Sequence, residues 1–502
     1  MSGSRHAGGC YWALLAGAFA LILATPGAGF AEEPAAAPLS PAAAPAPTRS
    51  EVPKTVLSWE TGAGRSYVIP AVEVVGYLFV LNQYDRHFVD PHEVYRTGTH
   101  SFWKNLTDST WVVDTDPFAT NQFLHPLGGT IYYGLPRSTG LNYWESLAYA
   151  TAGSFLWELG GETGPPSIND MITTPIGGSF LGEPLFRMAS LLLESGGGAP
   201  GFWRELGAAV ISPPTGFNRL VFGNRFGDVF PSRAPAVFTR VELGASLTAL
   251  EHNPISFTTR TIKQDQGTAD FSMAYGLPGK PGYSYTRPFD YFDFQFRAAS
   301  ANTFENIMTR GLLYGTSYAS GDAYRGVWGL YGSYDYLSPQ VFRVSSTALS
   351  LGTTGQWWLS DAIALQGTAL GGLGYGAAGV IHGVGERDYH YGATPQGLLA
   401  LRLLLGEVAM LDVTGREYYV SGVGSTERRG SETIGRGTAS FTVRVYGRHA
   451  LAVQYIASER DAHYPDIPNR HQSVGTISLA YVFLGDTRFG AVEWRAVDAA
   501  GR

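Results

Sequence analysis

Residues 237–483 alternate apolar and polar side chains, and this period of two constrains the fold more than any other feature of the sequence. From Phe292 to Arg297, three phenylalanines alternate with Asp, Gln and Arg, and a similar alternation recurs at 477–483. Successive side chains of a β-strand point to opposite faces, so segments of about ten residues with this pattern are typical of a membrane β-barrel with a polar lumen. We therefore predict a mainly β protein in which residues 237–494 form an antiparallel transmembrane barrel.

The number of strands follows from the length of this region. At roughly 20 residues for each strand and its turn, the region holds about 12 strands, with an expected range of about 10 to 14. The last strand of such barrels usually ends on an aromatic residue at the C-terminus. Phe483 resembles that ending, but residues 484–502 follow it. Residues 489–494 are a candidate for one more strand segment, so the identity of the closing strand stays open.

The N-terminus has the features of a cleaved secretory signal peptide. A basic start is followed by the apolar run 11–24 and by a small-residue cleavage site that ends at Ala31. Cys10 precedes the apolar run, which is not the arrangement of a lipoprotein, and an uncleaved N-terminal anchor is the alternative. Beyond the leader, no apolar run reaches the roughly 18 residues that a membrane helix needs. A chain of this kind enters a membrane as a barrel.

Composition narrows the class of protein. The charged fraction is 15%, the aromatic fraction is 13%, and there are 64 glycines, which suits a β-rich envelope protein. The net charge is −7 and no basic run is present, so a nucleic-acid partner is not expected. A soluble sandwich also alternates apolar and polar residues. The leader and the aromatic residues near strand ends favour the outer membrane, and a soluble periplasmic β-protein stays an alternative.

The region before the barrel is expected to be helical in part. Helices are predicted at 68–81, 141–159 and 176–194, and Pro184 either kinks the third helix or begins it. The predicted organisation is a signal peptide (1–31), a Pro/Ala-rich linker (32–55), a periplasmic mixed segment (56–120), a small helical subdomain (121–198), a connector (199–236) and the barrel (237–494).

One stretch before the barrel combines glycines, polar residues and charges closely. It contains NQFLHPLGGTIYYGLPRSTGLNYWES and TGPPSINDMITTPIGGSFLGE. Over about residues 116–187 it resembles the bacterial envelope family called domain of unknown function 3943. The resemblance implies a secreted envelope protein, expected in the outer membrane. It implies no particular activity.

The titratable residues of this stretch make a hydrolase one alternative. His125 would be the general base, an acid would orient it, and Ser154 or a water would be the nucleophile. Asn169 and Asp170, with the threonines after them, are also similar to residues of one lipid A deacylase family. The spacing of a recognised metal site is missing, so no metal or cofactor is expected. The catalytic candidates are His125, Glu145, Glu158, Glu162, Asn169 and Asp170.

The leading interpretation of the same charges is structural. A barrel of about 12 strands is wide enough to take a small helical plug, and buried charges in a plug need partners. Arg137 or Arg187 would then pair with Glu145, Glu158 or Glu183, and glycines would allow close packing. The structural or ligand-binding candidates are Arg137, Asn142, Gly177, Gly178, Gly182, Glu183 and Arg187.

The sequence therefore predicts an outer-membrane barrel with a channel, binding or envelope-structural role for a small or lipidic ligand. Its expected partners are outer-membrane lipids, such a ligand, and the barrel-assembly machinery during insertion. A lipid-directed hydrolase that uses His125 and the acidic residues is the alternative, and the sequence does not decide whether the protein is an enzyme.

Overall fold

The structure is a computed structural model, and it describes most of the chain from residue 56 to residue 495. The described residues are 56–89, 94–114, 116–252, 260–339, 342–379, 381, 385–423, 430–465 and 467–495. The predicted signal peptide and linker lie outside them. The chain divides into two compact units. Of the described residues, one unit comprises those within 56–73, 134–142 and 185–232, and the other comprises those within 74–133, 143–184 and 233–495.

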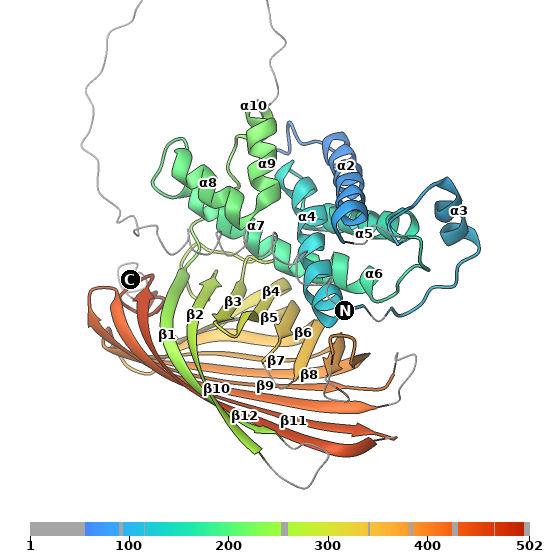
Figure 1. Cartoon of the computed structure of the whole chain (residues 1–502). Coiled ribbons are helices and arrows are strands. Elements are labelled where there is room, and N and C mark those ends of the chain that lie inside the picture. Colours follow the sequence, from blue (N-terminus) through green and yellow to red (C-terminus); the bar gives the residue numbers. More distant parts are fainter. Residues whose placement is uncertain are drawn as a thin grey trace, which may run out of the picture. The chain divides into compact units, whose positions relative to one another are not determined.

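Twelve antiparallel strands form a closed barrel in the second unit, which confirms the predicted fold and strand number (Figure 1). Each strand pairs with its neighbours in sequence, and β1 closes the barrel by pairing with β12, with Arg240 opposite Leu484. The strands are β1 (Val237–His252), β2 (Arg260–Tyr275), β3 (Phe292–Ala299), β4 (Asn302–Ser320), β5 (Tyr324–Leu337), β6 (Arg343–Trp358), β7 (Ile363–Gly379), β8 (Tyr389–Leu405), β9 (Ala409–Val420), β10 (Ser431–Tyr446), β11 (His449–Tyr464) and β12 (Ile467–Leu484).

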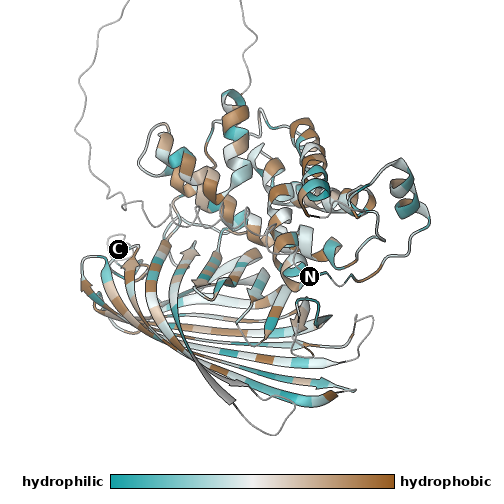
Figure 2. Cartoon of the chain, viewed as in Figure 1, coloured by the Kyte–Doolittle hydropathy of each residue, from teal (hydrophilic) through white to brown (hydrophobic). Residues whose placement is uncertain are grey.

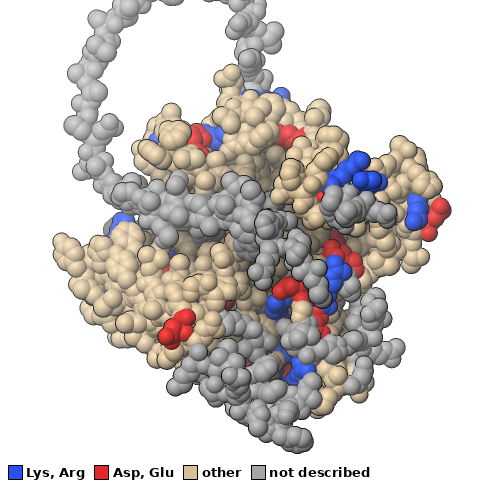
Figure 3. Space-filling model, in the orientation of Figure 1, with Lys and Arg blue, Asp and Glu red and all other residues tan. Residues whose placement is uncertain are grey.

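The alternation of the sequence matches the two faces of the barrel wall. On β10, Ser440 and Thr442 are buried in the lumen, whereas Phe441 is 46% exposed on the outside. Exposed apolar side chains recur at the outward positions of other strands, and they alternate with polar positions along the ribbons (Figure 2). Outward apolar residues include Leu243, Leu247, Trp328, Leu349, Leu351, Trp357, Leu373, Leu399, Leu401, Leu451, Val453, Ile477, Leu479 and Tyr481. On the face drawn in Figure 3, most of the atoms that are not grey belong to uncharged residues, which are drawn in tan.

The residues after β12 turn back into the end of the lumen, so the prediction of a further strand at 489–494 is wrong. Val492 exchanges two hydrogen bonds with the inward side chain of Gln356, which donates to its carbonyl at 2.7 Å and accepts from its amide at 2.9 Å. Phe489 and Trp494 are almost fully buried there. A strand would leave this backbone unpaired, because β1 already occupies the edge of β12.

Two apolar layers cross the lumen. The first is built around the C-terminal segment, residues 486–495, and the second lies near the opposite end. The first layer contains Phe238, Ala274, Leu277, Trp358, Ala364, Leu404, Met410, Ala450, Ala452, Val482, Leu484, Phe489, Val492 and Trp494. The second contains Met308, Leu337, Phe342, Val344, Ala378, Tyr418, Val420, Ile434 and Val474. The lumen between them is polar.

Helices precede the barrel, and three expected ones are present with shifted ends. The prediction missed a helix with Pro136 inside it, and it also missed the helices of the 199–236 region, where glycine and proline suggested a connector. No helix in the described part of the chain is long and apolar enough to cross a membrane. The helices are α2 (Val68–Tyr84), α3 (Thr99–Thr107), α4 (His125–Ser138), α5 (Tyr143–Gly160), α6 (Asp170–Ile172), α7 (Gly178–Glu194), α8 (Phe202–Ile211), α9 (Pro213–Val221) and α10 (Gly223–Phe226), with π-helical turns η1 (Asp85–Val89), η2 (Thr120–Leu124) and η3 (Thr173–Gly177).

Candidate functional site

The helical residues of the second unit pack against the outward face of the barrel wall. On β5, Asp335 lines the lumen, so its neighbour Tyr334 points outward. The Tyr334 hydroxyl donates a hydrogen bond to the carbonyl of Gln122. On β8, the outward Tyr391 hydroxyl accepts hydrogen bonds from the side-chain amides of Gln122 at 3.0 Å and Asn169 at 2.9 Å. These contacts fix η2 and the start of α6 on the outside of the wall.

The expectation that this segment plugs the lumen is therefore wrong for the residues that make these contacts. Phe123 stacks against Phe304 and Tyr336 of the wall, and Trp144 stacks on Tyr314. The physical reason is that inward positions carry Arg, Asp and Gln side chains, whereas these outward positions offer aromatic rings and hydroxyls. The C-terminal segment occupies the end of the lumen instead.

A polar cluster joins the same helices to the wall. Asn169 is its centre, because its amide donates to Asp170 Oδ1 at 3.0 Å and to Tyr391, while its Oδ1 accepts from the Asp114 backbone at 2.9 Å and from Ser167 Oγ at 2.8 Å. Glu158 accepts a hydrogen bond from the Ser167 amide at 2.6 Å. We call Asp114, His125, Glu158, Glu162, Ser167, Asn169 and Asp170 the wall cluster.

Five of the six catalytic candidates predicted from the sequence meet in the wall cluster. His125 Nε2 lies 3.7 Å from Asp170 Oδ2, which is ion-pair distance but longer than a hydrogen bond. His125 follows η2 and Asp170 precedes η3, and π-helical turns are frequent at functional sites. Glu145 stays apart, in the first turn of α5 and beside Tyr149. The candidate nucleophile Ser154 is buried and donates to the Asp170 carbonyl.

The carboxylates of the wall cluster hold their protons unusually strongly. Burial raises the pKa of Glu158 to about 8, and the charge of Asp170 adds to this effect. Burial also raises the pKa of Glu162 to about 7, and it holds the pKa of Asp170 well above its usual range. Neutral carboxyl groups at this position need no cation, which explains how so many acids share one histidine.

Stability of the docked helices is expected to depend on pH through Glu158. Its folded-state pKa lies above the unfolded value of 4.5, so its contribution is fully present below about pH 4.5. The contribution is lost as pH rises through about 8. Hydrogen exchange of residues 158–172 should therefore quicken between these values. In Glu158→Gln the amide stays neutral, and a pH slope as steep as in the wild type would contradict this assignment.

The remaining structural candidates have different surroundings. The Arg137 guanidinium lies over the rings of Phe186 at 4.4 Å and Phe230 at 4.6 Å, within the first unit. Arg187 lies over Phe230 at 5.4 Å. The predicted pairing of Glu158 with Arg137 or Arg187 is not observed among the described residues. Glu158 instead accepts a hydrogen bond from the Ser167 amide. Separately, the buried Glu183 accepts a hydrogen bond from Tyr133 at 2.7 Å, and Asn142 is exposed before α5.

The three glycines predicted to allow close packing do so. A Cβ on Gly178 would lie 2.6 Å from backbone atoms of Gly129, and one on Gly182 would lie 3.0 Å from the Tyr133 ring. A Cβ on Gly177 would lie 3.0 Å from the outward Thr347 hydroxyl. Gly177 and Gly178 therefore let η3 approach both the barrel wall and α4.

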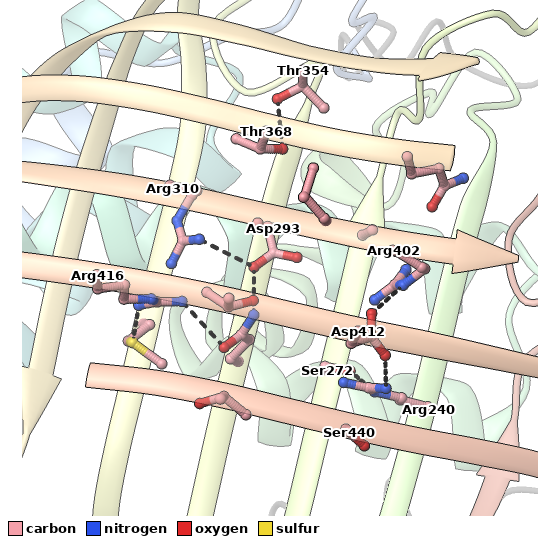
Figure 4. A pocket seen from close by; sticks show the side chains of 18 of the residues that line it. Arg240, Ser272, Asp293, Arg310, Thr354, Thr368, Arg402, Asp412, Arg416 and Ser440 are labelled. Atoms are coloured by element: carbon pink, nitrogen blue, oxygen red, sulfur yellow. Dashed lines mark hydrogen bonds and ion pairs between the residues drawn. The ribbon is translucent and has the colours of Figure 1, made fainter. Parts of the chain in front are cut away.

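The lumen holds a second group of functional candidates, which sequence reasoning missed. Between the two apolar layers is a cavity of about 150 Å³ with a mostly polar lining (Figure 4). The period-two pattern could have indicated it, because its charged lining residues share the inward parity. Its charged lining residues are Arg240, Glu242, Asp270, Asp293, Arg297, Arg310, Arg402, Asp412, Arg416 and Arg436.

Metal-ligand geometry occurs elsewhere. Among the described residues, the one grouping of three potential ligands within 4.8 Å is Glu459, Asp461 and His471, at the ends of β11 and β12. It is largely exposed, and His471 pairs with Asp461 at 2.8 Å. The wall cluster does not have this geometry.

Residues 110–214 match a protein-family model described as a domain of unknown function, DUF3943, which confirms the resemblance seen in the sequence. No curated protein matches the chain.

Several solved barrels are similar to this chain at low identity. The NanC porin is 7% identical, with 48% of this chain and 98% of that one covered, at a TM-score of 0.25. The outer membrane channel DcaP of Acinetobacter baumannii is 6% identical, with coverages of 49% and 97% and a TM-score of 0.23. A deltaS2 mutant of the TodX monoaromatic hydrocarbon channel is 9% identical, with coverages of 50% and 91% and a TM-score of 0.22.

Proposed function

We propose that this chain, whose residues 110–214 match a domain of unknown function, is an outer-membrane β-barrel that binds a ligand inside a sealed lumen and carries the family segment on its outer wall. The closed barrel and its exposed apolar outward side chains support insertion into a bilayer. Of the connections at the end where β1 begins and β12 ends, those at 321–323, 359–362, 406–408 and 447–448 are short and the one at 276–291 is long, whereas the opposite end combines the short connections 300–301 and 465–466 with longer ones. Short turns of this kind face the periplasm in such barrels.

The observation that carries the proposal is the pair of apolar layers across the lumen. One layer contains the C-terminal segment with Trp494, and the other contains Phe342 and Tyr418. An apolar constriction excludes water and ions even where atoms leave a narrow gap. A lumen crossed by two apolar layers is suited to binding or to a scaffold role, and it is poorly suited to free diffusion of solutes.

Wild-type protein in planar bilayers is therefore expected to give no conductance steps. Truncation after Gly485 removes Phe489, Val492 and Trp494 from the first layer but leaves β12 and the second layer, so this variant should also stay silent. Adding Phe342→Ala and Tyr418→Ala to the truncation opens both levels and should produce steps. Co-flotation with liposomes and heat-modifiable migration in SDS gels show that each variant is inserted and folded. Open-pore conductance of the wild type would overturn the proposal.

A lipid-directed hydrolase is the second candidate, and the position of the wall cluster favours it. The cluster lies on the outward face of the barrel, which is the side that meets lipid in an inserted barrel. His125 has an 18% exposed side chain, and Asp170 lies behind it. In a hydrolase, His125 would take a proton from water and Asp170 would orient the ring.

Replacing His125 tests this candidate directly. If the cluster is catalytic, His125→Ala should change the lipid A or phospholipid profile of cells that express it, and His125→Gln should do the same. Unchanged profiles in both variants, with folded barrel present in the membrane, would remove this candidate.

A further inference from the structure

The cavity of the lumen has a tightly paired end. Asp412 accepts from Arg402 at 2.6 Å and from Arg240 at 2.7 Å, and Arg240 also lies 3.0 Å from Glu242. Figure 4 shows Arg240 and Arg402 converging on the Asp412 carboxylate. Two guanidinium groups and two carboxylates satisfy one another here, so this end offers little to a ligand.

The other end of the cavity is loosely paired. Arg310 lies 3.9 Å from both Asp293 and Asp335, and Arg416 lies 3.5 Å from Asp335. These separations are longer than the charge-assisted hydrogen bonds that arginine makes with a well-placed carboxylate. The Arg310 side chain is only 5% exposed, and its buried Nη2 makes no hydrogen bond.

Arg436 is the least compensated cation of this end. Within the described part of the chain, no carboxylate comes within ion-pair distance of it, and its one hydrogen bond goes to Ser458 Oγ at 3.5 Å. Arg297, by contrast, lies 3.4 Å from both Glu305 and Asp270, so the missing compensation is specific to Arg436. Buried cations without close partners are costly, which makes this arrangement unusual for a purely structural interior.

We propose that Arg310, Arg416 and Arg436 bind a small free oxyanion, a phosphate or a carboxylate, inside the barrel. Guanidinium groups recognise such anions through paired N–H donors. A cavity of about 150 Å³ has room for a small anion with part of its hydration shell. The apolar layers exclude a lipid headgroup as the source, since its acyl chains would have to cross them. This site deepens the proposed function, because it rests on an enclosed lumen.

The test compares melting temperatures of protein folded into detergent micelles with and without the anion. Folding in the presence of the probe avoids the need for the closed barrel to open. Inorganic phosphate and succinate are the two probes, each against sodium chloride of equal ionic strength. At about 100 times the Kd, binding raises the melting temperature by roughly 5 to 10 °C. The probe that gives the larger rise identifies phosphate or carboxylate as the preferred class.

Two matched variants separate binding from general salt effects. Arg436→Gln should abolish the anion-dependent rise while leaving the melting temperature in chloride unchanged or higher, because it removes an uncompensated buried charge. Arg402→Gln at the tightly paired end should lower the melting temperature in chloride but keep the rise. The proposal would be overturned if the anion raised the melting temperature equally in the wild type and in Arg436→Gln. It would also be overturned if neither phosphate nor succinate raised the melting temperature of the wild type. The conductance experiment tests the closed lumen, and the melting temperatures test anion binding. A negative result for the anion site therefore does not imply that the lumen is open.

Discussion

Gly129→Ala is expected to lower the free energy of unfolding by about 3 kcal/mol, at the upper end of typical overpacking costs. A Cβ at this position would lie 1.8 Å from the carbonyl oxygen of Thr174 and 3.0 Å from Cα of Gly178. These are backbone atoms of η3 and α7, which cannot rotate away as a side chain can. The substitution must therefore push η3 away from α4, and with it the residues that contact the barrel wall.

Its control is the preceding residue. Gly128 lies in the same helix, and a Cβ there would meet nothing within 4 Å. Gly128→Ala should stabilise the protein by up to about 1 kcal/mol, because alanine favours the helix more than glycine does. Urea unfolding and proteolysis of residues 121–180 provide the measurement. Similar effects of the two substitutions would mean that the close approach of α4 and η3 contributes little.

The second large effect is expected from the ion pair between Arg460 and Glu432. Both side chains are fully buried in the lumen, and Arg460 donates to both carboxylate oxygens of Glu432 at 2.6 Å. Tyr464 donates to the same carboxylate. Arg460→Met leaves this carboxylate buried without its cation and should destabilise the barrel by about 3 to 5 kcal/mol.

Removing both charges should restore most of the loss. The double variant Arg460→Met with Glu432→Leu fills a similar volume without a buried charge, and it should lie close to the wild type or above it. Urea midpoints of the barrel in detergent micelles give the comparison. A double variant as unstable as Arg460→Met would show that the pair provides packing or hydrogen bonds that apolar residues cannot replace.

Much of the barrel was predictable because its signal is local. The alternation at Phe292 to Arg297 reports the two faces of a strand directly, and the length of the region predicts the strand number. The close packing at Gly177 and Gly178 was also predictable, since glycine spacing on a helix is a local property. Phe489 to Trp494 carries the same local signal, yet it forms no strand, because no strand edge is free to pair with it.

The sequence predicted which residues belong to the wall cluster, but it did not predict that the cluster lies on the outer wall of the barrel. Sequence reasoning gathered His125, Glu158 and Asp170, and the structure brings them together. Their attachment to the wall depends on Tyr391, which is 222 residues from Asn169 in the chain. The cavity of the lumen was missed for the same reason, since its arginines come from strands far apart in the sequence.

The sequence by itself therefore determined an antiparallel barrel of about 10 to 14 strands with an apolar outside, because the alternation of side chains along a strand reports its two faces. Only the tertiary structure decided what covers each face. The position of Tyr334 or Gln356 in the alternation predicts whether its side chain points outward or inward. It does not predict that Tyr334 binds Gln122 of the helical segment, or that Gln356 binds Val492 of the C-terminal segment. Those contacts depend on the free energy of bringing distant segments together, and the local periodicity of the sequence carries no information about that free energy.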